Sequence, residues 1–182
     1  MHLSEMLVLP ADPRTAAWLL ADPGYVREKV EAAGATCEQV DVTHDDAHAD
    51  PAPAGDATPG AGDDVGAFTV TTRRALPTDQ IPAQVRAFVG NRIEVRQVEA
   101  WEAPDDEGAR VGTVVVEVVG VPVRLAGRVT LVAHGAAQTA VRYDGEVHAA
   151  IPLFGGAVEE ATAAAIRGAL AAEEQVARRR FA

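Results

Sequence analysis

The sequence predicts an α+β fold in which one long C-terminal helix lies across an antiparallel β-sheet. The residues after Ile151 are rich in alanine and carry apolar side chains at helical spacing, which is typical of a long amphipathic helix. Most of the preceding chain alternates apolar and polar residues in short segments separated by turn residues, the pattern of β-strands. Because strands joined by short turns pair antiparallel, one apolar face of the sheet should pack on the helix.

The N-terminal part predicts one strand followed by two short helices. Residues 1–9 resemble an edge strand. Asp12 followed by Pro13 is typical of an N-cap with proline at the first helical position, and this helix should run to about Ala21. An Asp-Pro-Gly sequence then breaks the helix and starts a second one, which Gly34 closes.

Six further strands are predicted from alternating side chains. They cover residues 36–43, 66–74, 91–101, 110–120, 122–132 and 138–148. A short helix or helical turn is expected within residues 76–90. The alternation of the fourth strand slips near Gln97, which indicates a β-bulge.

In the C-terminal helix, small and apolar residues recur on one side. This stripe consists of Val158, Thr162, Ala165, Ala169, Ala172 and Val176, with Ile166 and Leu170 beside it. Glu159 and Glu160 are expected in the first turn and three arginines in the last, which suits the helix macrodipole. The small residues should let the helix contact the sheet closely through Ala165 and Ala169, which would shrink any cavity between them.

The composition of residues 44–64 predicts a mobile acidic loop. Aspartate, proline, glycine and alanine dominate this stretch, which has no large apolar residue to pack. By composition, two histidines and four aspartates of this region resemble a metal-binding cluster: His44, His48, Asp41, Asp45, Asp46 and Asp50. Zinc sites need rigidly held ligands, so we favour a solvated loop and expect no metal.

Composition and charge disfavour several functions. The 27 acidic and 16 basic residues give a net charge of -11, which disfavours nucleic acid as a partner. Cys37 is the only cysteine, so no internal disulfide can form. Its neighbours Glu38 and Asp41 would raise the pKa of its thiol, which favours a buried structural role over a nucleophile.

The length of 182 residues predicts a single domain, residues 1–182. The N-terminus lacks the basic region and long apolar core of a signal peptide, and no apolar run is long enough to span a membrane. With a single cysteine, these features favour a cytoplasmic protein without integral membrane association. Nucleotide-binding and nucleophile-elbow motifs are missing from the sequence, so no cofactor is expected.

Several segments resemble a known family. They are FTVTTRRALPTDQIP at 68–82, FVG at 88–90, EV at 94–95, Trp101, GEV at 145–147, IPLFGG at 151–156 and AIRGALAAEE at 165–174. On these segments the chain resembles the START-like or Bet v 1-like superfamily (SRPBCC), and more closely an actinobacterial family of unknown function within it. The resemblance implies a single START-like domain with the helix-grip fold, a curved seven-stranded antiparallel sheet around the C-terminal helix. Residues 44–64 are longer than the family pattern.

Superfamily relatives bind lipids, sterols, polyketides and other apolar molecules between sheet and helix, which implies such a cavity here. The wall residues we expect are Val70, Val114, Val116, Leu125, Val129, Val141, Tyr143, Ile166 and Leu170. Trp18 and Tyr25, on the N-terminal helices, are expected either to flank the entrance or to pack in the core. Because the close family has no established activity, the resemblance supplies no catalytic residue.

Three functions remain open from the sequence. The first is binding of a small hydrophobic or amphipathic ligand. The second is an enzyme of the polyketide cyclase or lyase type, which needs at least two polar groups converging in the cavity. Its candidates are the strand residues Arg96, Glu99, Arg124, Arg128 and Tyr143, although alternation places Arg124 and Arg128 in solvent. The third is a protein-interaction module whose own side chains fill the cavity. The sequence leaves the oligomeric state open.

Overall fold

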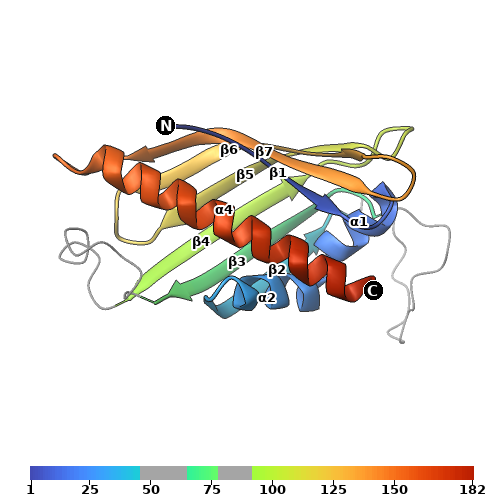
Figure 1. Ribbon diagram of the computed structural model, residues 1–182, viewed down its shortest axis with the longest axis horizontal. Helices are drawn as coiled ribbons and strands as arrows, with labels where there is room; N and C mark the ends of the chain where they lie inside the picture. Colours follow the sequence, from blue (N-terminus) through green and yellow to red (C-terminus); the bar gives the residue numbers. More distant parts are fainter. Residues whose placement is uncertain (46–64, 78–91) are drawn as a thin grey trace.

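The structure, a computed structural model, describes residues 1–45, 65–77 and 92–182 and confirms the predicted α+β fold (Figure 1). The elements are β1 (His2–Leu9), α1 (Pro13–Leu20), α2 (Pro23–Ala32), β2 (Thr36–His44), β3 (Phe68–Leu76), β4 (Ile93–Trp101), β5 (Arg110–Val118), β6 (Val123–Ala133), β7 (Thr139–Ala149) and α4 (Gly155–Arg180). The strands form one antiparallel sheet in the order β1-β7-β6-β5-β4-β3-β2.

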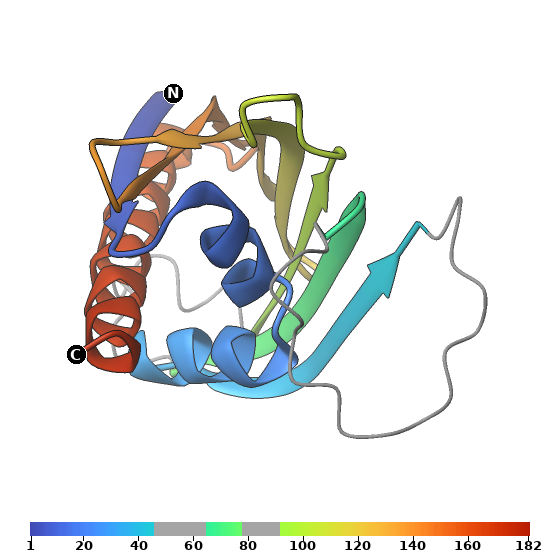
Figure 2. The ribbon, with the colours of Figure 1, turned by 90° about the vertical axis from the view of Figure 1, so that its right-hand side faces the viewer.

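The sheet curves around the helices, which join its two edge strands. In the end-on view of Figure 2, α4 runs beside β1, α2 lies beside β2, and α1 lies on the inner side of the sheet. α4 contacts β1, β7 and α2, and α2 contacts β2. The two helices therefore bridge the concave face from one edge of the sheet to the other.

The short helices begin as the sequence predicts. The side chain of Asp12 accepts hydrogen bonds from the backbone of Arg14 and Thr15, and that of Asp22 accepts from Gly24 and Tyr25. These caps satisfy amide groups that the first turn of a helix leaves unpaired. They fix where α1 and α2 start, and thereby the face that each helix buries.

Contacts near its two ends hold α4 in place. Val158 packs in a cluster with Val123, Ala149 and Ile151, whereas Val176 and Ala177 are fully buried in the main core. At the C-terminal end Arg180 pairs with Asp22 and Glu28 of the α2 region, at 2.7 and 3.0 Å. The helix is therefore anchored to the sheet at one end and to α2 at the other.

Glu159 does not lie in the first turn of α4, where the sequence predicts it. The helix begins at Gly155, so its first turn contains no acidic residue, and the expectation for Glu159 and Glu160 is wrong. Glu159 instead accepts a hydrogen bond from the backbone N–H of Ala149 at 3.0 Å. This bond joins α4 to the end of β7.

The bulge expected at Gln97 is also wrong. Gln97 pairs in regular register with Thr72 on β3 and Val116 on β5, and the irregularity lies in β2 between Cys37 and Gln39. The alternation slips because polar residues occupy the inner face of β4. The helix expected within residues 76–90 and the acidic loop at 44–64 fall largely outside the described residues, although His44 ends β2.

Two glycines allow a close approach of β6 and β7. Gly127 pairs with Gly145, and a Cβ on Gly127 would lie 2.3 Å from the carbonyl oxygen of Asp144 and 2.6 Å from the Cα of Gly145. Both contacts are to backbone atoms, which cannot rotate away. Any side chain here would therefore force the two strands apart.

We expect Gly127→Ala to lower the free energy of unfolding by about 1–3 kcal/mol, because the methyl group overpacks the sheet. Gly168→Ala is the matched control. A Cβ at Gly168 meets nothing within 4 Å, and alanine is the better helix former by about 1 kcal/mol. Thermal melts of both variants measure the difference. A Gly127→Ala variant as stable as the wild type would contradict the close approach.

Candidate functional site

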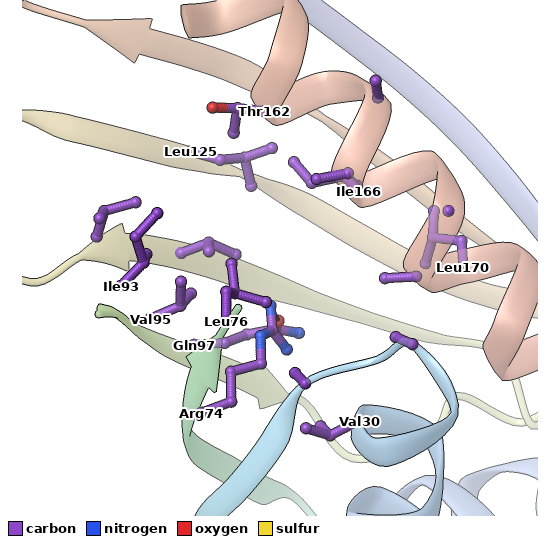
Figure 3. A pocket seen from close by; sticks show the side chains of 18 of the residues that line it. Val30, Arg74, Leu76, Ile93, Val95, Gln97, Leu125, Thr162, Ile166 and Leu170 are labelled. Carbon is purple, nitrogen blue, oxygen red and sulfur yellow. Dashed lines mark hydrogen bonds between the residues drawn. The ribbon is translucent and has the colours of Figure 1, made fainter. Parts of the chain in front are cut away.

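A cavity of about 530 Å³ lies between the concave face of the sheet and the helices α4 and α2 (Figure 3). Most of its wall is aliphatic. The sheet contributes Leu76, Ile93, Val95, Val114, Val116, Val118, Val123 and Leu125, and the helices contribute Val30, Val158, Ile166 and Leu170. The volume falls within the range of small-molecule sites, roughly 300–1,000 Å³. The side chains of the described residues therefore leave this space open, which disfavours the third hypothesis of a filled core.

The small residues of α4 make room for the cavity. The helix lines it with Ala161, Ala164, Ala165, Gly168, Ala169 and Ala172. Ala165 is exposed and Ala169 half-buried, so the expected close sheet contact through them is not what holds the helix; Ala163 on the neighbouring face is fully buried. Because these side chains end at Cβ, they widen the cavity, which is the reverse of the sequence-based expectation.

An ion pair between the two helices borders the cavity. Lys29 of α2 and Glu173 of α4 lie 2.9 Å apart, Nζ to Oε1, and their side chains are only 12% and 6% exposed. The hydroxyl of Tyr25 donates to the same carboxylate oxygen at 3.4 Å. Glu173 thus receives two donors from successive turns of α2, and the bonds tie the helices together.

Burial and pairing have opposite effects on the pKa values of Lys29 and Glu173. Burial raises the pKa of the Glu173 carboxyl, and Lys29 offsets only part of that effect. Burial alone would lower the pKa of Lys29, but Glu173 and Glu99 outweigh it and raise the pKa. Burial and Glu173 hold the pKa of Tyr25 well above normal, and burial with Glu99 and Glu173 does the same for Tyr143. Both tyrosines therefore stay protonated and act as donors.

A second polar group gathers around Glu99 on β4. Its carboxylate accepts hydrogen bonds from Gln97 Nε2 at 2.5 Å, Trp101 Nε1 at 3.3 Å and the Tyr143 hydroxyl at 3.3 Å. Gln97 in turn accepts a hydrogen bond from Arg74 Nη2 at 2.8 Å. The chain from Arg74 through Gln97 to Glu99 crosses from β3 to β4, and Arg74 and Gln97 line the cavity.

A second, water-sized cavity of about 10 Å³ lies behind the first. Its lining includes Lys29, Thr72, Gln97 and Glu99. The hydroxyl of Thr72 is buried and has no hydrogen-bond partner among the described residues. A volume of about this size with several polar neighbours suits one buried water molecule.

The expected wall residues divide into two groups. Val114, Val116, Leu125, Tyr143, Ile166 and Leu170 line the cavity. Val129 and Val141 are fully buried in the main core instead, and Val70 lines only the small cavity. All three point inward as strand alternation requires, but they lie where side chains already fill the space under the sheet.

The expected entrance residues do not line the cavity. Tyr25 is fully buried and binds Glu173, so packing and hydrogen bonding describe it rather than gating. Trp18 is partly exposed on α1 and is not part of the wall. Six residues of the cavity wall are also exposed to solvent. Three lie near the ends of α2 and β3, namely Ala32, Ala33 and Pro77, and three lie on α4, namely Ala164, Ala165 and Gly168. The mouth of the cavity therefore lies between these segments.

Of the polar candidates, Glu99 and Tyr143 point inward, while Arg96, Arg124 and Arg128 are exposed. Lys29, Arg74, Gln97 and Glu173 were missed, although each carried a signal in the sequence. Arg74 continues the alternation of Phe68, Val70 and Thr72 on β3. Glu173 follows Ala169 by four positions on the apolar stripe of α4, and Lys29 follows Tyr25 by four on α2.

Cys37 is buried, and the pKa of its thiol is raised, as the sequence suggested. The main cause is burial rather than Glu38 and Asp41. Among the described residues, no group of three or more His, Cys, Asp or Glu is placed to hold a metal ion. His48, Asp46 and Asp50 lie outside that part of the chain. Within it, no helix is long and apolar enough to cross a membrane.

Comparison with known proteins supports the fold and names a family. The family described as "Protein of unknown function (DUF2505)" matches residues 6–180. No curated protein matches the chain. Structural likeness extends to the protein TTHA0849 from Thermus thermophilus, with a TM-score of 0.57, 14% identity and 100% of both chains covered.

Two further solved structures share the architecture. The Zhui aromatase/cyclase from Streptomyces sp. R1128 has a TM-score of 0.51 and 13% identity over 100% of this chain and 96% of its own. A START superfamily protein from Mycobacterium smegmatis has a TM-score of 0.50 and 12% identity over 98% and 97%. At sequence identities this low, structural likeness is evidence for the fold alone. That likeness confirms the START-like helix-grip fold.

We expect Lys29 and Glu173 to stabilise the fold only when both are present. Lys29→Met leaves the Glu173 carboxylate buried without its cation, which should lower the free energy of unfolding by about 3–5 kcal/mol. The double variant Lys29→Met, Glu173→Leu removes both charges and should recover most of that loss. Urea denaturation of the single and double variants measures both effects.

The exposed pair of Arg178 and Glu174 on α4 serves as the control. The corresponding variants Arg178→Met and Arg178→Met, Glu174→Leu should differ little, because solvent screens such pairs. Equal losses in the single and double variants at Lys29 and Glu173 would refute a coupled pair.

Proposed function

We propose that this chain, which belongs to the DUF2505 family, binds a small hydrophobic or amphipathic molecule in the cavity between the sheet and α4. The observation that carries the proposal is a preformed aliphatic cavity with a few convergent polar groups, the usual composition of ligand sites. The cavity opens to solvent, so water or a ligand fills it.

Water against an aliphatic wall is easily displaced by an apolar molecule, because burial of apolar surface from both partners is favourable. We infer that Val114, Val116, Leu125, Ile166 and Leu170 contact that molecule. One structural neighbour is an aromatase/cyclase, and by analogy of fold we infer a lipid- or polyketide-like ligand, carried rather than converted. We further infer a single domain that works without a cofactor in the cytoplasm of an actinobacterium.

We expect the neutral probe N-phenyl-1-naphthylamine to gain fluorescence in the wild-type protein. Ala169→Phe should reduce probe affinity by at least about tenfold, because the ring occupies the cavity. The same variant should unfold within a few degrees of the wild type, since the ring enters open space. In a packed core the substitution would instead cost roughly 1–3 kcal/mol.

Ala171→Phe is the matched control, because Ala171 lies on the same helix, is exposed and is not part of the wall. It should keep the affinity of the wild type. A wild-type protein that does not bind the probe, combined with a destabilised Ala169→Phe, would overturn the proposal.

A second candidate, an enzyme, is favoured by one observation. Lys29, Arg74, Gln97, Tyr143 and Glu173 converge on the cavity, which meets the condition stated for the cyclase or lyase hypothesis. Burial raises the pKa of the Glu173 carboxyl, which makes it a better proton acceptor than an exposed carboxylate. In such a reaction Glu173 would remove a proton from the carbon beside a carbonyl group of the ligand.

Exchange of the α-protons of 2-decanone in deuterated buffer, followed by NMR, tests this candidate. An enzyme of this kind should accelerate exchange by about a hundredfold or more. Glu173→Gln, which still offers an acceptor to Lys29, should abolish the acceleration. Exchange at the rate of buffer alone would leave binding as the function.

A further inference from the structure

Arg74 is a cation in the cavity wall that contacts no carboxylate among the described residues. It lines the wall on β3, and its one hydrogen bond among the described residues is the bond from Nη2 to Gln97. No carboxylate of those residues lies within 4 Å of its guanidinium, although a guanidinium carries several donors. Burial lowers the pKa of Arg74, and Glu99 offsets only part of that effect.

The nearby carboxylates are committed to other groups. Glu173 is paired with Lys29 at 2.9 Å and also accepts from Tyr25. Glu99 accepts from Gln97, Trp101 and Tyr143, which are neutral donors that stabilise its charge in place. A carboxylate at Arg74 would therefore replace no existing ion pair.

The surroundings of Arg74 fit one end of an elongated amphipathic molecule. Figure 3 shows its side chain rising from β3 among Leu76, Val95 and Gln97, while Ile166 and Leu170 of α4 face it from across the cavity. The guanidinium of Arg74 forms no hydrogen bond to a described group other than Gln97. Its remaining nitrogens are not buried, so they face the cavity space. From there an apolar chain can run along the alanines of α4.

We propose that Arg74 binds the carboxylate of an amphipathic acid whose apolar part fills the cavity. The proposal rests on the ligand-binding function above and adds the chemistry of the head group. Arginine suits this role because its planar fork donates two parallel hydrogen bonds to a carboxylate. The charges of Lys29, Arg74, Glu99 and Glu173 sum to zero, so the preference for an acid comes from the hydrogen-bond donors of Arg74 rather than from net charge.

Displacement of N-phenyl-1-naphthylamine by dodecanoate and by 1-dodecanol tests the proposal. The two competitors share one apolar chain and differ in the head group. The wild type should bind dodecanoate at least about tenfold more tightly than dodecanol, since hydrogen bonds to charged groups contribute this much. Arg74→Met should remove the preference, which is read as the ratio of the two affinities so that any change in the apolar wall affects both competitors alike.

Arg73→Met is the matched control, because Arg73 directly precedes Arg74 on the same strand. Its side chain faces solvent and pairs with Glu94 at 2.8 Å. It changes the net charge equally and should keep the preference for the acid. If Arg74→Met does not fold, Arg74→Lys keeps the charge but loses the fork, and it should retain part of the preference.

The outcomes separate the two proposals. A wild type that binds the neutral probe but binds dodecanoate no better than dodecanol overturns the role of Arg74 and leaves ligand binding intact. Equal loss of preference in Arg73→Met and Arg74→Met also overturns it, because the effect would then come from net charge. A wild type that binds no probe, acid or alcohol overturns the ligand-binding function itself.

Discussion

The ion pair between Lys29 and Glu173 determines where α4 can lie. It joins the long helix to α2 near one end, while Val158 and the bond from Ala149 to Glu159 join the other end to the sheet. Between these anchors the helix follows the β1 side of the sheet rather than its centre. The strands from β3 to β6 therefore keep part of their inner face uncovered, and the cavity is the space between that part and the helix.

The same arrangement separates the charged groups by role. Glu173 and Glu99 are both stabilised by groups of the protein itself, so they hold the structure together without any ligand. Arg74 is different, because its burial is only partly compensated. A protein that retains such a group inside an apolar cavity loses folding stability by doing so, and binding of an acid would return part of it.

Much of the fold followed from the sequence, because the signals that produce it are local. Strand alternation, the caps at Asp12 and Asp22 and the turn glycines each act within a few residues. Alternation also placed Leu125 and Val129 correctly on the inner face. It could not say that one lines the cavity and the other is core, because that depends on how far α4 stands from each strand. Arg74 and Glu173 were overlooked for a related reason: charged residues in apolar positions make sense only once their partners on other elements are known.

Six of the eleven residues that α4 contributes to the cavity wall have no side chain beyond Cβ. Lengthening any of them would reshape the space without touching the sheet, the helix caps or the ion pair. Single substitutions along this helix can thus change which molecules are admitted while the framework stays the same. Members of the family can accordingly diverge in what they bind faster than in how they fold, and this one helix face is where such divergence would first be found.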